Sequence, residues 1–188
     1  MITSDTYTKF IPKKDTKNRI LFGDGSTSTI ISSRNIKGSY KILDTVHGTD
    51  GSGSNFAIIK SFGNRFRNST QTQDKNLFLD GPGLYNFALG VVPKGIKKFL
   101  DKFKINQNKI DYYIFHQANK FMIDGLINVM SLNKKKVIID MKNTGNTTSS
   151  SIPIILKKYE KKFKKGDNLL LVAFGGGLSW GITMIKKA

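Results

Sequence analysis

Phe174-Gly175-Gly176-Gly177-Leu178-Ser179-Trp180-Gly181 joins two apolar runs near the C-terminus. The runs are Leu169 to Phe174 and Ile182 to Ile185, so we expect a strand, a tight turn and a second strand. Consecutive glycines cost conformational entropy, and chains keep them where the backbone needs positive φ or approaches a ligand closely. Such a loop can aim N–H groups at a developing negative charge, as an oxyanion hole does. Taken alone, the stretch fits a plain glycine-rich hairpin turn equally well.

Composition limits the possible functions before any further motif is considered. The 188 residues suffice for one domain with a sizeable core. No apolar run approaches the roughly 18 residues that span a bilayer, and the N-terminus lacks the pattern of a secretory signal. We therefore expect a cytoplasmic protein that does not enter a membrane. The sequence has no cysteine, which excludes disulfides, thiolate metal sites and a cysteine nucleophile, and we expect neither a metal nor a bound cofactor.

The formal net charge is +18, and lysine supplies most of the excess. The lysines are concentrated in three clusters, at 94–104, 134–136 and 157–165. A field of this sign attracts nucleic acid, anionic lipid or an acidic protein. No aromatic residues interleave with the basic runs as they do in nucleic-acid-binding motifs. An acidic partner protein is therefore the better interpretation, and we expect no nucleic-acid partner.

Alternating strand and helix patterns predict an α/β layered fold. Apolar residues at helical spacing predict a helix over 84–103, which Pro93 should kink or divide, and another over 121–130. A third helix should follow Asn146, with polar cap groups between Thr147 and Ser151. Strands are predicted at 2–7, after the turn at 23–25, and at 40–46, 111–115, 137–141, 167–174 and 181–185.

Residues 47–76 are rich in Gly, Ser, Asn and Thr and show little periodicity. This composition predicts a long surface excursion. Loops of this length in a compact domain are usually functional or partly ordered by a substrate.

Two polar residues lie where an α/β sheet binds ligands. His116 directly follows a predicted strand, and open α/β sheets bind ligands beyond the carboxyl ends of their strands. Asn146 precedes the third predicted helix. Each residue has an ordinary alternative, because His116 fits a hydrogen-bonded structural role and Asn146 fits a plain helix N-cap. Neither residue decides a function alone.

Three motifs together resemble the 3-oxoacyl-(acyl-carrier-protein) synthase III family, which belongs to the thiolase superfamily. They are His116-Gln117-Ala118-Asn119, the run from Thr144 to Pro153, and the glycine stretch at 174–181. Phe22-Gly23-Asp24-Gly25 and the segment 81–93 are similar to the same family. The order and spacing agree across the whole chain, so the match is more specific than any single glycine string.

The resemblance implies an acyltransferase of fatty-acid or related acyl-chain biosynthesis. Such an enzyme condenses acyl-CoA with malonyl-acyl carrier protein in a decarboxylative Claisen reaction. By this resemblance His116 and Asn146 form the catalytic pair that holds the malonyl thioester carbonyl, with His116 as a neutral donor. Two donors aimed at that oxygen stabilise the charge that develops on it, and losing one typically costs about 100-fold in rate.

The same resemblance implies roles for four further residues. The backbone N–H of Gly176 would stabilise the oxyanion on the acyl side of the reaction. Phe174 would form a wall of the acyl pocket, and Asn119 and Gly81 would lie along the pantetheine tunnel.

The sequence departs from the family pattern in two ways. The family's nucleophilic cysteine is absent, together with the half of the protein that carries it. We therefore expect an incomplete thiolase-like α/β/α fold, with residues 1–35 as the end of the N-terminal repeat and residues 36–188 as the C-terminal condensing-enzyme domain. In addition, Phe121 occupies a place where the family often has a basic residue for CoA or carrier protein, and Lys120 is displaced from it by one position.

The leading interpretation is the C-terminal part of a synthase III-like condensing enzyme, truncated or split and inactive by itself. The alternative is a non-catalytic half-module that pairs with another chain and binds an acidic carrier protein through its lysine faces. A third possibility is decarboxylation of a malonyl thioester by His116 and Asn146 without cysteine. Intact family members are homodimers, so the resemblance implies a homodimer or a separate N-terminal half as partner. The acyl chain length and the pathway stay open.

Overall fold

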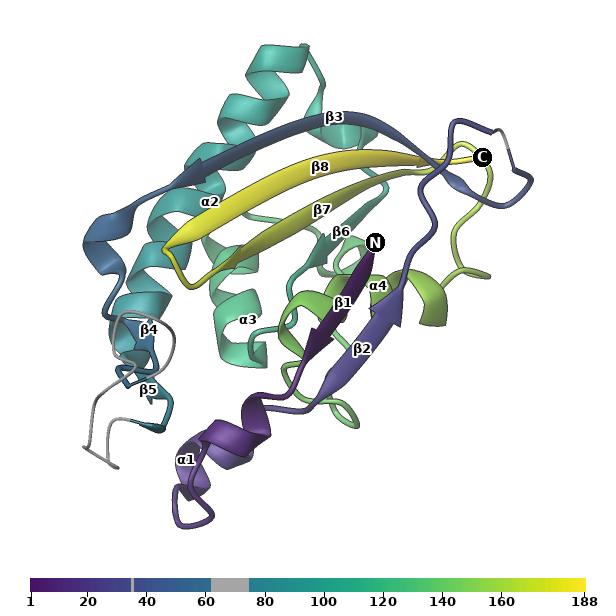
Figure 1. Cartoon of the computed structure of the whole chain (residues 1–188). Coiled ribbons are helices and arrows are strands. Elements are labelled where there is room, and N and C mark those ends of the chain that lie inside the picture. The colour runs from purple at the N-terminus through teal and green to yellow at the C-terminus, as the bar shows by residue number, and fades with distance from the viewer. Residues whose placement is uncertain (35, 62–74) are drawn as a thin grey trace.

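A mixed four-stranded sheet forms the centre of the chain in the computed structural model, which describes residues 1–34, 36–61 and 75–188 (Figure 1). The strand order is β3-β8-β7-β6, with β6 and β7 parallel and the other neighbours antiparallel. Its strands are β3 (Tyr40–Thr49), β6 (Tyr112–Phe115), β7 (Asn168–Gly175) and β8 (Ser179–Lys187). Two further antiparallel pairs are β1 (Ile2–Asp5) with β2 (Gly25–Ser28), and β4 (Ala57–Ile58) with β5 (Phe78–Leu79).

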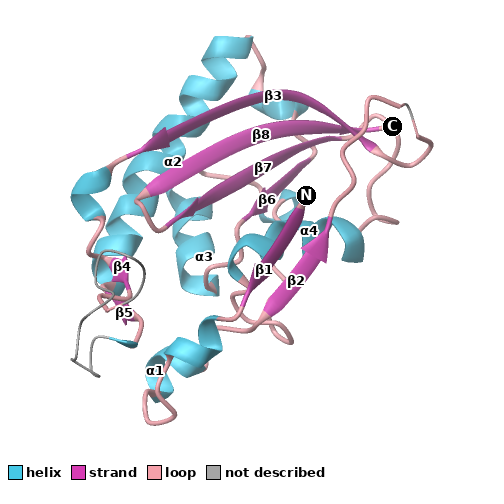
Figure 2. Cartoon of the chain, in the orientation of Figure 1, coloured by secondary structure: helices cyan, strands magenta, loops and turns pink. Residues whose placement is uncertain are grey.

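Helices cover both faces of this sheet (Figure 2). The α-helices are α1 (Thr16–Arg19), α2 (Gly81–Phe103), α3 (Lys120–Val129) and α4 (Ser151–Lys158). Short 3-10 helices cover Tyr7–Phe10, Gly51–Gly53, Gln107–Lys109, Lys134–Lys136 and Thr148–Ser150. No helix within the described ranges is long and apolar enough to cross a bilayer.

The alternation of side chains along the strands explains the layers. Tyr113 and Phe115 of β6 pack into the core beneath α2 and α3, while Ile114 between them packs with Ile155 of α4 on the opposite face. All four of these side chains are buried. The predicted α/β layered architecture is therefore confirmed. Strand β6 packs on both faces of the sheet and ends immediately before His116.

Helix α2 is one continuous helix of 23 residues. Asp80 caps its start by accepting a hydrogen bond from the Gly83 N–H at 2.9 Å, and Pro82 occupies the first turn, where a proline is tolerated. Pro93 lies inside the helix and does not divide it, so of the two predicted outcomes, a kink or a division, the division was wrong. The apolar face of α2, including Val92, packs against the sheet and holds the helix together across the proline.

The strand predicted at 137–141 is reduced to one bridge between Tyr113 and Val137. The side chain of Gln117 replaces the rest of the pairing. Its Nε2 donates to the carbonyls of Phe115 and Ile138, and its Oε1 accepts from the N–H of Asp140 at 2.9 Å. A side chain that bridges two backbones leaves no periodic signal in the sequence, which is why the prediction failed here.

The excursion predicted at 47–76 is more ordered than expected where it is described. Strand β3 continues to Thr49, a 3-10 helix covers Gly51–Gly53, and β4 follows. Residues 62–74 lie outside the described ranges. The helix predicted after Asn146 begins instead with the 3-10 turn Thr148–Ser150, and α4 follows without a side-chain cap.

Replacing Gln117 with methionine should destabilise the chain by about 2–4 kcal/mol. Gln117 is only 2% exposed, and methionine would leave the three backbone groups that it pairs without partners. Urea denaturation followed by circular dichroism measures the free energy of unfolding. Asn128→Leu, an exposed amide on α3, is the control and should change it by less than about 0.5 kcal/mol. Equal effects of both substitutions would contradict the structural role given to Gln117.

Candidate active site

His116 begins the site immediately after β6. Its backbone N–H donates to the Val172 carbonyl at 2.7 Å, so the β6–β7 ladder fixes the main chain that carries the imidazole. The ring Nδ1 lies 2.7 Å from the Ser151 hydroxyl, and the ring packs edge-on against Phe174, with 5.7 Å between ring centroids. Three elements, β6, β7 and α4, therefore hold one imidazole in place.

Protein surrounds the His116 ring, although the residue keeps partial access to solvent. Burial disfavours the charged imidazolium and lowers the pKa of His116 from 6.5 to about 4. The Asp5 carboxylate and a hydrogen bond to the Thr148 backbone act in the opposite direction and do not cancel the effect of burial. The ring is therefore neutral at physiological pH.

Asn146 is held by the N-terminal part of the chain. Its backbone N–H donates to the Leu21 carbonyl at 2.7 Å, and its own carbonyl accepts from the Gly23 N–H at 3.1 Å. Gly145 takes a positive φ of 62°, and a Cβ on Gly23 would come within 1.9 Å of the Thr144 carbonyl oxygen. Both glycines are required because the two backbones pass so close together.

The Asn146 side chain is oriented by the turn that follows it. Its Oδ1 accepts a hydrogen bond from the Thr148 N–H at 2.9 Å, and the residue is 9% exposed. The amide Nδ2 has no hydrogen-bond partner within the described part of the chain. The N-cap of the following 3-10 helix is Thr147, so the alternative of a plain N-cap at Asn146 was wrong. The Oδ1 of Asn146 instead closes an Asx turn, and its amide N–H groups stay available for a ligand.

Residues 146–151 form one polar segment that connects the two predicted catalytic residues. Asn146 bonds to Thr148, and Ser151 at the end of the segment bonds to His116. Asp5 of β1 anchors the middle, because its carboxylate accepts from both the N–H and the hydroxyl of Ser149. Burial opposes ionisation of Asp5, but these hydrogen bonds dominate and lower its pKa.

The glycine turn follows Phe174, and Phe174 connects it to the site by contacting His116. Phe174 is the penultimate residue of β7 and is 8% exposed, and its ring contacts His116. Gly176 follows in the solvent-exposed turn between β7 and β8, near Ala57 of β4. The two predicted strands and their tight turn are confirmed, with Gly175 paired to Ser179.

Asn119 and Gly81 start two neighbouring helices. Asn119 is the N-cap of α3 and accepts from the Met122 N–H at 2.8 Å, whereas Gly81 is the exposed first residue of α2. Tyr85 of α2 stacks on Phe121 of α3, with 5.0 Å between ring centroids, and so joins the first turns of both helices. No hydrogen bond or ring contact in the described ranges links Gly81 to His116 or Asn146.

Sequence reasoning missed the supporting residues Asp5, Thr148 and Ser151 as parts of the site. Ser151 was expected only to cap a helix, and Asp5 lies 111 positions before His116 in the chain. Thr148 adopts a positive φ of 48°, which is unusual for a β-branched residue and typical of functional sites. The run of Thr and Ser between Asn146 and Ile152 was the available signal, and its composition alone could not separate capping from positioning.

Comparison with known families shows what the chain is similar to. A model described as 3-oxoacyl-[acyl-carrier-protein] synthase III matches residues 1–51, and the model of the C-terminal part of the same enzyme matches residues 100–187. The chain belongs to the 3-oxoacyl-[acyl-carrier-protein] synthase III family. His116, Asn146 and Phe174 all fall within the C-terminal match, and Asp5 and Gly23 fall within the other. The domain boundary at residue 35 stays a prediction.

Relatives in the synthase III family align with nearly the whole chain. Beta-ketoacyl-[acyl-carrier-protein] synthase III of Clostridioides difficile and that of Clostridium tetani are each 35% identical to it over 99% of its length. The alignments cover 57% and 58% of those proteins, so the chain spans little more than half their length.

Solved structures show the same fold. A 3-oxoacyl-(acyl-carrier-protein) synthase III superposes with a TM-score of 0.88 at 30% identity, covering 98% of this chain and 59% of that one. The synthase III of Aquifex aeolicus VF5 superposes with a TM-score of 0.82 at 26% identity, covering 98% and 56%. The predicted thiolase-like fold, present in part, is therefore confirmed.

The stability of this synthase III-family chain should depend on the ionisation of His116. The folded pKa of about 4 lies below the unfolded value of about 6.5. Between these pH values the unfolded state binds a proton that the folded state does not. The free energy of unfolding should therefore fall as the pH drops from about 6.5 to about 4, with an upper limit on the order of 3 kcal/mol from His116.

Urea denaturation at pH 7 and pH 4.5 measures this effect, with His116→Gln as the matched variant. The wild-type chain should lose more stability on acidification than the variant, because both share every other titrating group. An identical pH dependence of the two proteins would contradict the neutral, buried state of His116.

Gly23→Ala tests the contact between the Asn146 turn and the N-terminal segment. The added Cβ meets backbone, which cannot move aside as a flexible side chain can, so we expect a loss of about 2–4 kcal/mol. Gly90→Ala is the control, because Gly90 is exposed on α2 and a Cβ there meets nothing within 4 Å. That substitution should stabilise the chain by about 0.5–1 kcal/mol. Thermal and urea unfolding measure whether each substitution lowers or raises the free energy of unfolding.

Proposed function

We propose that this chain is the C-terminal part of a beta-ketoacyl-acyl carrier protein synthase III-type condensing enzyme. It would act in fatty-acid or related acyl-chain biosynthesis, with acyl-CoA and malonyl-acyl carrier protein as substrates. One observation carries the proposal. His116, kept neutral by burial, and Asn146, fixed through its Oδ1, are joined by the polar segment 146–151.

His116 acts as a hydrogen-bond donor in this proposal. The Ser151 hydroxyl lies between the Gln117 N–H, at 3.4 Å, and Nδ1 of His116, at 2.7 Å. When Ser151 accepts from Gln117, its own hydrogen is free to donate to Nδ1. The imidazole proton then resides on Nε2, and Ser151 is a positioning residue for this tautomer.

The decarboxylation step uses His116 and Asn146 together. Nε2–H of His116 and Nδ2–H of Asn146 donate to the carbonyl oxygen of the malonyl thioester. The bond between the α-carbon and the carboxylate breaks, CO2 leaves, and the electron pair moves into an enolate whose charge rests on that oxygen. Two neutral donors in a largely buried site stabilise this charge without prior proton transfer.

The condensation step needs a group that this sequence does not contain. The enolate carbon attacks the carbonyl of an acyl thioester held on a cysteine, the C–S bond breaks, and the cysteine leaves as the thiolate. The sequence has no cysteine to carry the acyl group. We propose that a separate or preceding N-terminal half supplies the cysteine, and that the chain by itself does not condense. The Gly176 N–H would stabilise the tetrahedral oxyanion, and Phe174 would border the acyl group.

Two further residues are proposed to contact the substrate away from the reacting atoms. Asn119 and Gly81 would line the pantetheine tunnel at the starts of α3 and α2. The non-catalytic half-module draws no support from the relatives described above. Assembly as a homodimer stays a prediction.

A chimera tests the proposed chemistry directly. The N-terminal region of the Clostridioides difficile relative is fused ahead of Met1, and condensation of acetyl-CoA with malonyl-acyl carrier protein is measured. The chimera should be active, and His116→Ala and Asn146→Ala should each lower the rate about 100-fold or more. Asn108→Ala, an exposed residue in the 3-10 helix Gln107–Lys109, should leave the rate unchanged. A folded chimera whose activity survives His116→Ala would overturn the assignment.

The unmodified chain provides an independent measurement. Malonyl-CoA should shift the NMR signals of the His116 ring and leave those of His47 in place, because these are the two histidines of the sequence. With acetyl-CoA present as well, the chain should yield no condensation product. The absence of any His116 shift at millimolar malonyl-CoA would contradict the proposed substrate contact.

A further inference from the structure

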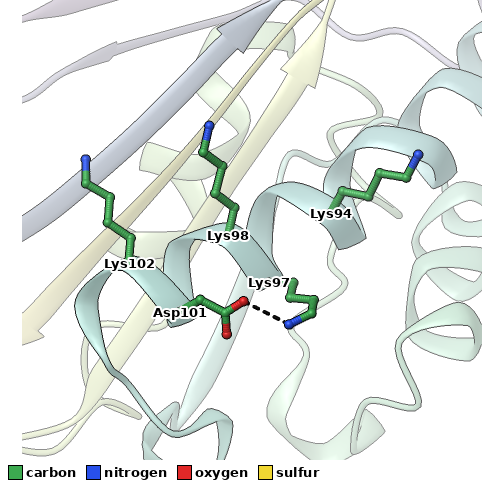
Figure 3. A pocket seen from close by; sticks show the side chains of 5 residues that line it. All are labelled: Lys94, Lys97, Lys98, Asp101 and Lys102. Carbon is green, nitrogen blue, oxygen red and sulfur yellow. Dashed lines mark hydrogen bonds and ion pairs between the residues drawn. The ribbon is translucent and has the colours of Figure 1, made fainter.

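Helix α2 carries a row of lysines without acidic partners. Lys94, Lys98 and Lys102 recur at every fourth residue and share one side of the helix; we call them the lysine row. Their neighbour Lys97 instead pairs with Asp101 at 2.8 Å, away from the side on which Lys98 and Lys102 project (Figure 3). Within the described ranges no carboxylate lies within 4.0 Å of the lysine row. Its charge therefore faces solvent uncompensated.

The lysine row lines a groove of about 370 Å³ between α2 and β3. The rest of the lining mixes apolar and polar groups from three elements: Thr45, Val46 and His47 of β3, Val91 and Gly95 of α2, and Trp180 of β8. Trp180 approaches α2 closely, since a Cβ on Gly95 would lie 3.3 Å from its Nε1. The groove thus combines a charged rim with a partly apolar base.

Strand β3 forms the open side of this groove. It is the edge of the four-stranded sheet, and among the described residues β8 is its one strand partner. An edge strand presents unpaired main-chain N–H and C=O groups, onto which a further strand can be added. Charged residues on an edge strand itself commonly block such pairing. Strand β3 itself carries Lys41 and Asp44, but neither lines the groove. The lysine row lies on the neighbouring helix, where it can select the charge of the added strand.

The spacing of the lysine row matches an extended peptide. Four residues of α-helix advance about 6 Å, so successive lysines of the row are separated by this rise. Side chains on one face of a strand recur every two residues, about 6.7 Å apart. The two repeats are similar, so carboxylates at alternate positions of a strand added to β3 can face neighbouring lysines of the row.

We propose that the groove between α2 and β3 binds an extended acidic segment of a partner protein. The segment adds to β3 as a further strand and pairs alternate Asp or Glu side chains with Lys94, Lys98 and Lys102. This docking goes beyond acyl transfer and does not use His116 or Asn146. A nucleic acid would satisfy the lysines but not the main-chain groups of β3, so an acidic peptide fits the groove better.

A labelled peptide tests the proposal on the complete chain. Its core is Glu-Val-Glu-Val-Glu, and fluorescence polarisation reports binding. The triple variant Lys94→Gln, Lys98→Gln and Lys102→Gln should weaken binding about tenfold or more, since it removes three exposed charge pairs with the peptide. Circular dichroism checks that the exposed substitutions leave the fold intact.

The control variant removes the same charge elsewhere. Lys161→Gln, Lys164→Gln and Lys165→Gln, all exposed between α4 and β7, should change the affinity less than about threefold. Equal losses in the two triple variants would show attraction to net charge alone and would overturn the proposal.

Peptide variants test the strand geometry and the class of partner. A block peptide, Glu-Glu-Glu-Val-Val, should bind more weakly, and so should the alternating peptide with N-methylated alternate amides, which cannot complete the ladder. Equal affinity of these peptides would exclude addition to β3. Tighter binding of a single-stranded oligonucleotide, lost in the Lys94, Lys98 and Lys102 variant, would assign the groove to nucleic acid instead.

Discussion

The backbone contact between residues 21–23 and residues 144–146 is the constraint on which the site depends. Asn146 exchanges hydrogen bonds with Leu21 and Gly23 across a contact so close that neither Gly23 nor Gly145 can carry a side chain without displacing backbone. These two segments are more than 120 positions apart in the sequence. Since the contact fixes the start of segment 146–151, it fixes the donor geometry of Asn146 and the position of Ser151 against His116. A local backbone requirement thus determines a distant side-chain arrangement.

That segment also explains how a polar site is kept neutral inside a buried environment. The charge nearest to it, the Asp5 carboxylate, is occupied by the N–H and hydroxyl of Ser149. Burial therefore lowers the pKa of His116 more than the field of Asp5 raises it, and the ring stays uncharged. Neutral donors suit a reaction in which negative charge appears on a carbonyl oxygen, because they stabilise that charge without having to lose a proton.

The sequence was sufficient to predict the elements that have strong periodicity and the residues that end them. The β7–β8 hairpin and the two long helices follow from the apolar patterns along these elements, and the position of His116 follows from the short apolar strand β6. It failed where a single side chain replaces a ladder, as Gln117 does beside residues 138–140, and where the apolar face of α2 overrides Pro93. Asp5 and Ser151 could not be assigned to the site, because hydrogen bonds across the fold leave no local signal.

The positive charge of the chain lies on its surface and not in the candidate active site. With His116 neutral and Asn146 an amide, the net charge of +18 has no part in the proposed carbonyl contact. Next to the site, at the start of α3, Lys120 is paired with Asp124, and the following residue is the exposed Phe121, stacked on Tyr85. The lysine row lies elsewhere, along the C-terminal half of α2 beside the edge strand β3, and no carboxylate of the described residues is within 4.0 Å of it. A lysine costs little in stability on an exposed helix, so this arrangement can specify a partner without disturbing the site.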